Sequence, residues 1–422
     1  MRNANISQSL YPIQLINHTM HINADLHIHS KYSMATSPKM DLPTLASESR
    51  KKGIQLVATG DCLHPKWLSE IRKIREENGV FSIDNIHFVL TTEIEDANQV
   101  HHLLIIPSVS KAEELYEFMK PHSNNIDSDG RPTVRLTGVE IAQAAKDAGA
   151  LIGPAHAFTP WTAMYAYHNS LKDCYGDMAG YIYPIELGLS ADTSYADRIS
   201  ELSCLTFLTN SDAHSPYVNK LAREFNRFEM EDISFDELSM AIIREKGRKP
   251  LLNVGMPPEE GKYNESACIR CFKHYTMRES IIKNWRCSCG GIIKKGVKDR
   301  VNELASYDTP HHPSHRPPYL HLIPLSEIIA MALEIGTNTK GVQKIYDVLI
   351  NQYGSEVAVL VDSAVNDSGV DERVIDAINA FREGRVRVIP GGGGQYGKVE
   401  LGSAAPAKGP EAQKSLFDYK EG

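Results

Sequence analysis

The feature that most constrains the fold is a regular alternation of short apolar runs with helical patterns across residues 22–250. The apolar runs include IHFVLTTEI, HLLIIP, ALIGPAH, YPIELG and LTFLTNSDAH. Between them lie stretches such as LPTLASESRKKG, in which Pro43 suits a helix start and Gly53 a helix end. Repeated strand and helix units predict an α/β fold with a parallel sheet, either open or closed into a barrel. In both forms, functional groups gather at the carboxyl ends of the strands.

Residue types that bind metals stand at the ends of these runs. In the segment Asp25-Leu-His27-Ile-His29, side chains alternate between the two faces of a strand, so the three polar side chains lie on one face. There the two imidazoles can share a metal ion, and Asp25 can orient one of the rings. Four more runs end in such residues: Asp61 with His64, Glu93 with Glu95, His156, and Asp212 with His214. Zinc, iron and manganese accept such ligands, so the pattern predicts a multinuclear hydrolytic site; ordinary structural histidines are the alternative.

In chain order, the segments DLHIHS, GDCLH, TTEIE, HLLII, GPAH and SDAH resemble the motifs of the polymerase and histidinol phosphatase (PHP) phosphoesterases. This resemblance implies a distorted (β/α)7 barrel holding two or three divalent ions of zinc, manganese, magnesium or iron. Carried over motif by motif, it implies as active-site metal ligands His27, His29, Asp61, His64, Glu93, His102, His156, Asp212 and His214. Glu93, Asp212 and His214 are the candidate catalytic residues. His101 is expected to face away from the site.

The second of these motifs departs from the family pattern. The family commonly has Thr-Asp-His there, whereas Cys62 and Leu63 separate Asp61 from His64 in this chain. Either residue can therefore be the ligand at this position.

A cysteine module follows the first region. Cys268-x2-Cys271 and Cys287-x-Cys289, followed by two glycines, have the two-knuckle form of a zinc ribbon with one structural zinc ion. Free thiols or a redox pair are the alternative. Residues 262–300 hold ten Lys and Arg against three acidic residues, a net charge of +7 in a chain of −8. Lys294, Lys295 and Lys298 are candidates to bind DNA phosphates, and a solvated charged face is the alternative.

Breaks in composition suggest four parts. We expect a PHP-type domain over 1–255, a four-cysteine zinc-binding domain over 256–306, a mainly helical domain over 307–400 and a flexible tail over 401–422. The Pro- and His-rich stretch 307–319 is interpreted as a surface linker. No apolar run approaches the ~18 residues of a membrane span and no signal peptide is visible, so we expect a cytoplasmic protein without membrane contact.

The tail carries a possible docking motif. Gln413, Leu416, Phe417 and Tyr419 resemble the box that binds a PCNA-type sliding clamp, in which Leu and aromatic side chains fill an apolar pocket. An ordinary solvated tail is the alternative.

The combination of these parts favours nucleic acid as the substrate. The whole chain resembles a PHP-type DNA repair endonuclease, which implies hydrolysis 5′ of deaminated bases (uracil, hypoxanthine, xanthine) and of abasic sites. A PHP-type phosphatase acting on a small phosphate ester and a non-catalytic clamp-bound adaptor are the alternatives. A base flipped out of the duplex needs aromatic side chains to stack on, and the candidates are Trp161 and Tyr165. Ser190 is the candidate polar partner of the base or its sugar, and Lys220 and Arg223 are the candidates to hold phosphate oxygens.

Overall fold

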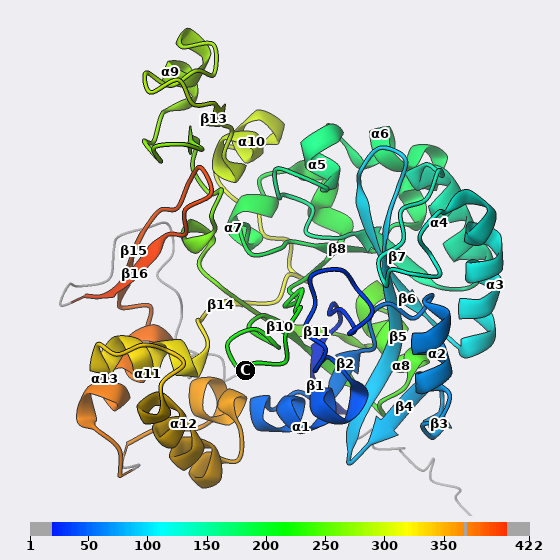
Figure 1. The fold of residues 1–422 in the computed structure, drawn as a ribbon, viewed down its shortest axis with the longest axis horizontal. Helices are drawn as coiled ribbons and strands as arrows, with labels where there is room; N and C mark the ends of the chain where they lie inside the picture. The colour runs from blue at the N-terminus through cyan, green and yellow to red at the C-terminus, as the bar shows by residue number, and fades with distance from the viewer. Residues whose placement is uncertain (1–18, 367–368, 403–422) are drawn as a thin grey trace, which may run out of the picture.

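The structure is a computed structural model that describes residues 19–366 and 369–402. Its centre is a ten-stranded mixed sheet (Figure 1). The strands of this sheet are β1 (Met20–Asp25), β2 (Leu56–Ala58), β3 (Glu76–Glu77), β4 (Val80–Ile83), β5 (Ile86–Glu95), β6 (His101–Ile106), β7 (Leu151–Pro154), β10 (Phe225–Met230), β11 (Lys249–Gly255) and β14 (Tyr319–His321). Two further strands, β8 (Pro184–Glu186) and β9 (Thr206–Leu208), form a separate parallel pair.

The direction of the strands corrects part of the expectation. The pairs β1–β2 and β2–β5 are parallel, as predicted, but β5–β6 and β6–β7 are antiparallel. Only residues 96–100 connect β5 to β6, and so short a connection cannot hold the crossover that parallel strands need. The mixed α/β class is confirmed, whereas the purely parallel sheet is wrong.

The strands that carry the ligand-type residues curve around a common interior. Gly153 of β7 lies against the backbone of β8, where an added Cβ would be 2.1 Å from the carbonyl oxygen of Pro184. The segment after β9 returns to β1, because the Asp212 amide donates to the His27 carbonyl (2.9 Å) and the His29 amide to the Ala213 carbonyl (3.0 Å). The carboxyl ends of these strands therefore face one another.

Helices cover the outside of this sheet: α1 (Leu42–Lys52), α2 (Pro65–Ile71), α3 (Val109–Met119), α4 (Gly138–Asp147), α5 (Met164–Tyr167), α6 (Leu171–Tyr175), α7 (Thr193–Ala196) and α8 (Phe235–Ile243). Helix α1 begins and ends where the sequence signals predict. Asp41 accepts from the Thr44 amide as N-cap, and Gly53 ends the helix with a left-handed φ of 85°. Its apolar side chains Leu42, Leu45 and Ala46 pack into the large core between helices and sheet.

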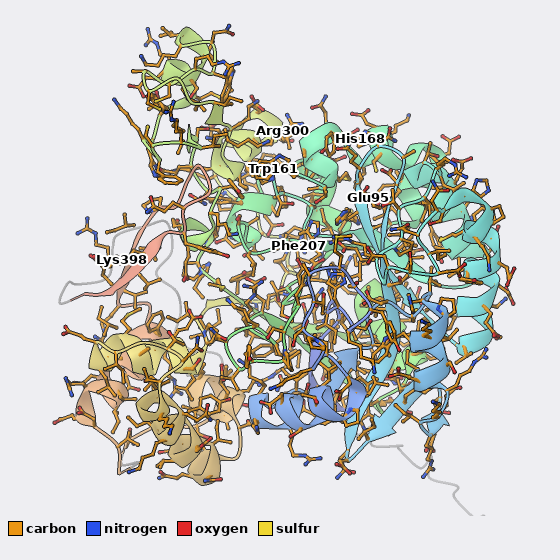
Figure 2. All side chains as sticks on the ribbon, in the orientation of Figure 1. Glu95, Trp161, His168, Phe207, Arg300 and Lys398 are labelled. Atoms are coloured by element: carbon orange, nitrogen blue, oxygen red, sulfur yellow. The ribbon has the colours of Figure 1, made fainter. Side chains whose placement is uncertain are left out.

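The cysteine module projects from this body (Figure 1). It consists of β12 (Ala267–Cys268), α9 (Met277–Ile282) and β13 (Ile293–Lys294), and α10 (Val297–Leu304) connects it to the body. Arg300 of α10 donates to the carbonyls of Tyr165 (2.8 Å) and His168 (3.0 Å). Figure 2 shows Arg300 and His168 close together at this joint. The module is thus attached to the segment that follows β7.

The C-terminal part is mainly helical, with α11 (Leu325–Leu333), α12 (Lys340–Tyr353), a π-helical turn at Ala358–Asp362 and α13 (Glu372–Arg382). A hairpin of β15 (Val386–Ile389) and β16 (Lys398–Leu401) follows, and Lys398 marks it in Figure 2. The stretch 307–319 is anchored rather than free, because Arg316 forms a buried ion pair with Asp197 at 2.8 Å. Across the described residues, no helix is long and apolar enough to cross a membrane.

Candidate active site

Histidine and carboxylate side chains from several strand ends form three overlapping clusters. Within each cluster the candidate ligand atoms lie within 4.8 Å of one another. Glu93 stands at the centre: its Oε1 is 2.6 Å from His101 Nδ1 and 2.9 Å from His156 Nε2, and its Oε2 is 3.3 Å from His29 Nε2. The clusters comprise His27, His29 and Glu93; His29, Asp212 and His214; and Glu93, His101 and His156. Because the clusters share Glu93 and His29, the site is suited to more than one ion.

Two of these side chains are held in an uncommon backbone conformation. His156 and Asp212 have φ of 29° and 47°, in the left-handed region that non-glycine residues seldom adopt. Each such residue costs about 1–3 kcal/mol, and such strain concentrates at functional sites. The surrounding hydrogen bonds of β1 and β8 therefore fix where these two ligand-type groups point.

Buried carboxylates hold the histidine rings from behind. Glu186 Oε2 lies 2.8 Å from His27 Nδ1 and also accepts from the His156 amide at 3.2 Å. Asp61 Oδ1 lies 3.0 Å from His29 Nδ1. In both rings Nε2 is left to face the cluster, which is the arrangement that carboxylate partners give to metal-binding histidines.

Charges within the site shift the protonation of its members. Burial opposes a charge on His27, but the carboxylates of Glu186, Glu93 and Asp212 raise its pKa to about 9. Burial also opposes a charge on Glu93, yet the surrounding histidines, His101 foremost, lower the pKa of this carboxyl well below its usual range. Glu93 is therefore ionised, and the His27 imidazole holds a proton that a divalent ion would replace on binding.

The side chains present fit a metal centre. Four buried atoms that face one another have no hydrogen-bond partner among the described residues: His27 Nε2, His29 Nε2, Asp212 Oδ1 and His214 Nδ1. Buried polar atoms are rarely left unpaired, and here all four are imidazole nitrogens or a carboxylate oxygen, the donors that zinc, iron and manganese accept. These four atoms could therefore coordinate ions.

The prediction for the adjacent histidines 101 and 102 is wrong. In the β5–β6 ladder Glu95 pairs with His101 and Ile94 with His102, so His101 shares the face of Glu93 and His102 takes the opposite one. His102 is buried behind the sheet, with Nδ1 2.8 Å from the Tyr175 hydroxyl and Nε2 3.3 Å from Asp96. His101 therefore belongs to the site and His102 does not.

Two other predicted ligands and one predicted orienting residue also lie outside the clusters. Asp61 uses its second oxygen for the Ser30 amide (2.6 Å) and the Ser33 hydroxyl (2.9 Å), so it positions His29 rather than facing an ion. His64 stacks on Tyr32 with ring centroids 4.5 Å apart. Asp25 accepts from the Ser211 and Ala222 amides, and among the described residues it forms no hydrogen bond with an imidazole ring.

Sequence reasoning missed two side chains beside the clusters. Glu186 lies within the apolar run YPIELG as the last residue of β8, and an acidic residue at that position was the available signal. Arg131 lies in an irregular loop, with Nη1 3.4 Å from Glu93 Oε2, and no sequence pattern points to it. The positive charge of Arg131 therefore faces the site.

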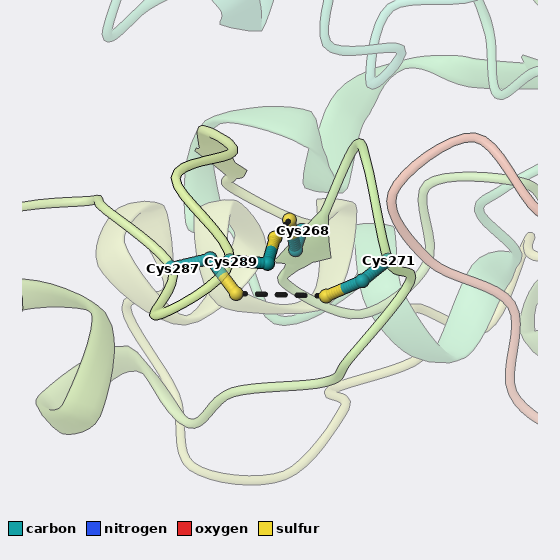
Figure 3. Close-up of side chains that lie close together, drawn as sticks. All are labelled: Cys268, Cys271, Cys287 and Cys289. Atoms are coloured by element: carbon teal, nitrogen blue, oxygen red, sulfur yellow. Dashed lines mark hydrogen bonds between the residues drawn. The ribbon is translucent and has the colours of Figure 1, made fainter.

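The four cysteines converge as predicted (Figure 3). Cys271 Sγ and Cys287 Sγ lie 3.5 Å apart, as do Cys268 Sγ and Cys289 Sγ. The Tyr275 hydroxyl, 3.0 Å from Cys287 Sγ, lowers the pKa of that thiol to about 6. Four sulfur atoms so arranged suit one tetrahedral zinc ion, and such closed sites leave no position for catalysis.

Comparison with known proteins gives full-length matches. The lesion-specific endonuclease PfuEndoQ from Pyrococcus furiosus is 47% identical and superposes with a TM-score of 0.87 over 91% of this chain and 96% of that one. An endonuclease Q bound to a 27-mer duplex with an abasic lesion at the active site is 45% identical, with a TM-score of 0.87 over 92% of this chain and 99% of that one.

The chain belongs to the endonuclease Q family. Among curated proteins, YqxK of Bacillus subtilis is 31% identical over 90% of this chain and 99% of its own length. MJ0043 of Methanocaldococcus jannaschii is 42% identical over 58% of this chain, which spans only 31% of that longer protein. Residues 324–385 match the MJ0043 C-terminal domain model. The predicted family and enzyme class are confirmed.

Several residues that were predicted to bind DNA instead contact other residues of this endonuclease Q family chain. Tyr165 is fully buried and donates its hydroxyl to Glu201 at 2.7 Å, so its predicted role as a stacking platform is wrong. Ser190 is buried against Gly261. Lys295 pairs with Glu303 (2.5 Å) and Lys298 with Glu265 (3.2 Å).

Other predicted DNA contacts lie near the surface. Trp161 is exposed, with its ring under the Lys294 ammonium at 4.1 Å, and Lys294 also donates to the Pro160 carbonyl at 3.1 Å. Lys220 is exposed and Arg223 half-buried, with Nε donating to the Ser211 carbonyl at 3.1 Å. The clamp-box residues Gln413, Leu416, Phe417 and Tyr419 lie outside the described residues, so clamp binding stays a prediction.

Proposed function

We propose that this chain is a metal-dependent DNA repair endonuclease that hydrolyses the phosphodiester bond 5′ of deaminated bases (uracil, hypoxanthine, xanthine) and of abasic sites. The observation that carries the proposal is the convergence of unpaired His and Asp ligand atoms around Glu93. Its support comes from the family, in which one solved member holds a duplex with an abasic lesion at the active site. The partner is accordingly lesion-containing duplex DNA.

The residues of the site divide the work. Two or three divalent ions held by the clusters would activate a water and neutralise charge that develops on the phosphate. Glu186 and Asp61 fix the rings of His27 and His29, so that the ligand atoms are in place before DNA arrives. Arg131 supplies positive charge beside Glu93 for phosphate oxygens. The exposed Lys220 and the half-buried Arg223, which donates to the Ser211 carbonyl, are the further candidates for this role.

We further propose a division of labour along the chain. Residues 1–255 carry the chemistry in a PHP-type barrel, and residues 256–306 hold one structural zinc ion. Residues 307–400 support the substrate, and the tail over 401–422 binds a sliding clamp. Trp161 lies at the joint between the first two parts, where an exposed indole can stack on an unpaired base.

End-labelled duplexes test the proposal. Each carries one uracil, one hypoxanthine, one abasic site or no lesion, and is incubated with manganese, magnesium or zinc, with Asp212→Ala as the control. We expect nicking immediately 5′ of the altered nucleotide and none by the variant. Intact DNA under all three metals would contradict the proposal, and hydrolysis of p-nitrophenyl phosphate in that case would identify a small-ester phosphatase instead.

A further inference from the structure

A groove runs between α3 and α4 on the outer surface of the body. Figure 1 shows the two helices together on the side of the body away from the C-terminal helices. The α3–α4 groove has a volume of about 440 Å³, and its apolar walls are Leu115, Phe118, Val139, Ala144 and Ala148. Two of these side chains remain uncovered, with Phe118 44% and Val139 37% exposed. An exposed aromatic ring and an exposed valine in one groove of this size indicate a docking site.

The rim of the α3–α4 groove is acidic. Glu114, Glu140 and Asp147 line it, and no Lys or Arg does so among the described residues. Lys111 pairs with Glu114 at 2.6 Å, whereas Glu140 and Asp147 form no ion pair within residues 19–366 and 369–402. A segment that complements the groove therefore carries apolar side chains, a positive charge and no carboxylate.

The N-terminal stretch of the chain has this composition. Residues 1–18 lie outside the described residues, and their sequence contains Ile6, Leu10 and Ile13, the cation Arg2 and no Asp or Glu. This stretch therefore matches the groove in both apolar character and charge.

The C-terminal stretch 403–422 matches less well. It carries three acidic residues, Glu411, Asp418 and Glu421. It also follows β16, which Figure 1 shows on the opposite side of the molecule from α3 and α4. The N-terminal stretch is thus the better candidate to occupy the groove.

The N-terminal stretch enters the fold at the end of the sheet where α4 ends. β1 begins at Met20 and leads to His27 in the active site, and β7 begins at Leu151 and leads to His156. Both strands therefore start at the end of the sheet away from the active site. Ile22 and Leu151 pack in one core cluster there, and α4 ends just before β7 begins.

The stretch is long enough to reach and follow the groove. In the order β1–β2–β5–β6–β7, four spacings of about 4.8 Å separate β1 from β7, which is about 20 Å. Helix α4 has ten residues and is about 15 Å long. An extended chain covers about 3.3 Å per residue, so 18 residues reach about 60 Å. Residues 6–13 can therefore lie along the groove.

We infer that residues 6–13 dock in the α3–α4 groove, with their apolar side chains against Phe118 and Val139 and with Arg2 beside the acidic rim. The docked segment ties α3 and α4, which contact β6 and β7, to the start of β1. This inference is independent of the proposed function, because it involves no DNA.

Hydrogen exchange in the full-length protein, followed by mass spectrometry, tests the inference. We expect the amides of residues 6–13 to exchange at least about tenfold more slowly than in a free peptide of the same sequence. Phe118→Ser/Val139→Ser is expected to remove this protection, because it deletes the apolar contacts that hold the segment.

Two further variants separate docking from damage to the fold. Ile6→Ser/Leu10→Ser changes no residue of the described body, and it is expected to accelerate exchange in α3 and α4. Val348→Ser replaces a valine of α12 that is 38% exposed, and as the matched control it should leave residues 6–13 protected. Melting curves identify any variant that has lost its fold, and in that case the segment variant decides.

Three results would overturn the inference. Unprotected amides in residues 6–13 of the wild-type protein would do so, and binding of a cationic amphipathic peptide to the groove would then identify a basic partner as its occupant. Protection that survives Phe118→Ser/Val139→Ser would mean that the segment docks elsewhere. Protection that increases with protein concentration would mean that the segment docks on a second copy of the chain.

Discussion

At the scale of single residues, the adjacent histidines 101 and 102 have opposite roles. His101 lies 2.6 Å from Glu93 within a cluster, and His102 lies 3.3 Å from Asp96 behind the sheet. We expect His101→Ala to lose active-site metal and cleavage. His102→Ala should retain the metal but melt at a lower temperature, because it leaves the buried Asp96 and Tyr175 without their partner. Metal content by elemental analysis and melting curves distinguish the two, and equal metal loss in both variants would contradict this assignment.

Glu224 gives the molecule a pH-dependent stability. It is fully buried, and burial raises its pKa from the ordinary 4.5 to about 8. At pH values between about 4.5 and about 8, folding therefore takes up a proton at Glu224. The contribution of this group to the free energy of unfolding falls as the pH rises through that range. Glu224→Gln removes that effect, and its melting temperature should rise relative to the wild-type protein between these limits. A pH-independent difference between the two proteins would contradict the expectation.

At the scale of elements, Arg300 couples α10 to the segment after β7. Its guanidinium donates to two backbone carbonyls and to Asn169 Oδ1 at 2.7 Å. We expect Arg300→Ala to accelerate amide hydrogen exchange in residues 163–170, because local opening no longer breaks these bonds. Lys295→Ala, which loses a surface ion pair with Glu303 and a contact with the Trp285 ring, should leave that exchange unchanged. Protection equal to that of the wild-type protein in Arg300→Ala would show that the joint does not depend on this residue.

The sequence predicts elements better than it predicts how they pair. Apolar runs and helix signals placed α1, β5, β7 and the strand 386–389 correctly, because each depends on local chemistry. The antiparallel β5–β6 pair and the choice of His101 depend on register, which one sequence does not reveal. Likewise, Glu93, His156, Glu186 and Asp212 stand at or shortly after strand ends, whereas Arg131 enters the site from an irregular loop through a tertiary contact.

At the scale of the whole molecule, a buried ion pair joins the C-terminal helices to the body. Lys52 Nζ of α1 lies 2.6 Å from Glu356, which also accepts from the Leu325 amide (3.1 Å) and the Tyr346 hydroxyl (3.0 Å). Lys52→Met leaves a buried carboxylate unpaired and should cost about 3–5 kcal/mol of unfolding free energy. Denaturant unfolding measures this loss.

The neighbouring lysine supplies the control for that loss. Lys51 forms an exposed pair with Glu48 at 2.7 Å, and Lys51→Met should cost at most about 1 kcal/mol. Lys52→Met/Glu356→Gln should recover part of the loss, since no charge then remains unpaired. Equal stability of the Lys51 and Lys52 variants would indicate that the pair does not hold the C-terminal helices on the body.

The cysteine cluster has a consequence for oxidative stress. Cys271 is exposed and its sulfur lies 3.5 Å from that of Cys287, so an oxidant such as peroxide can join the two thiols in a disulfide. That disulfide would release the zinc ion that we propose the cluster holds. Through Lys294 and Arg300 the ribbon supports the segment that starts at His156. Peroxide is therefore expected to reduce DNA cleavage through oxidation of the ribbon and not of the active site. Treatment with a thiol reductant and zinc is expected to restore cleavage. A repair enzyme built this way would be least active in the cells whose DNA suffers most from oxidants.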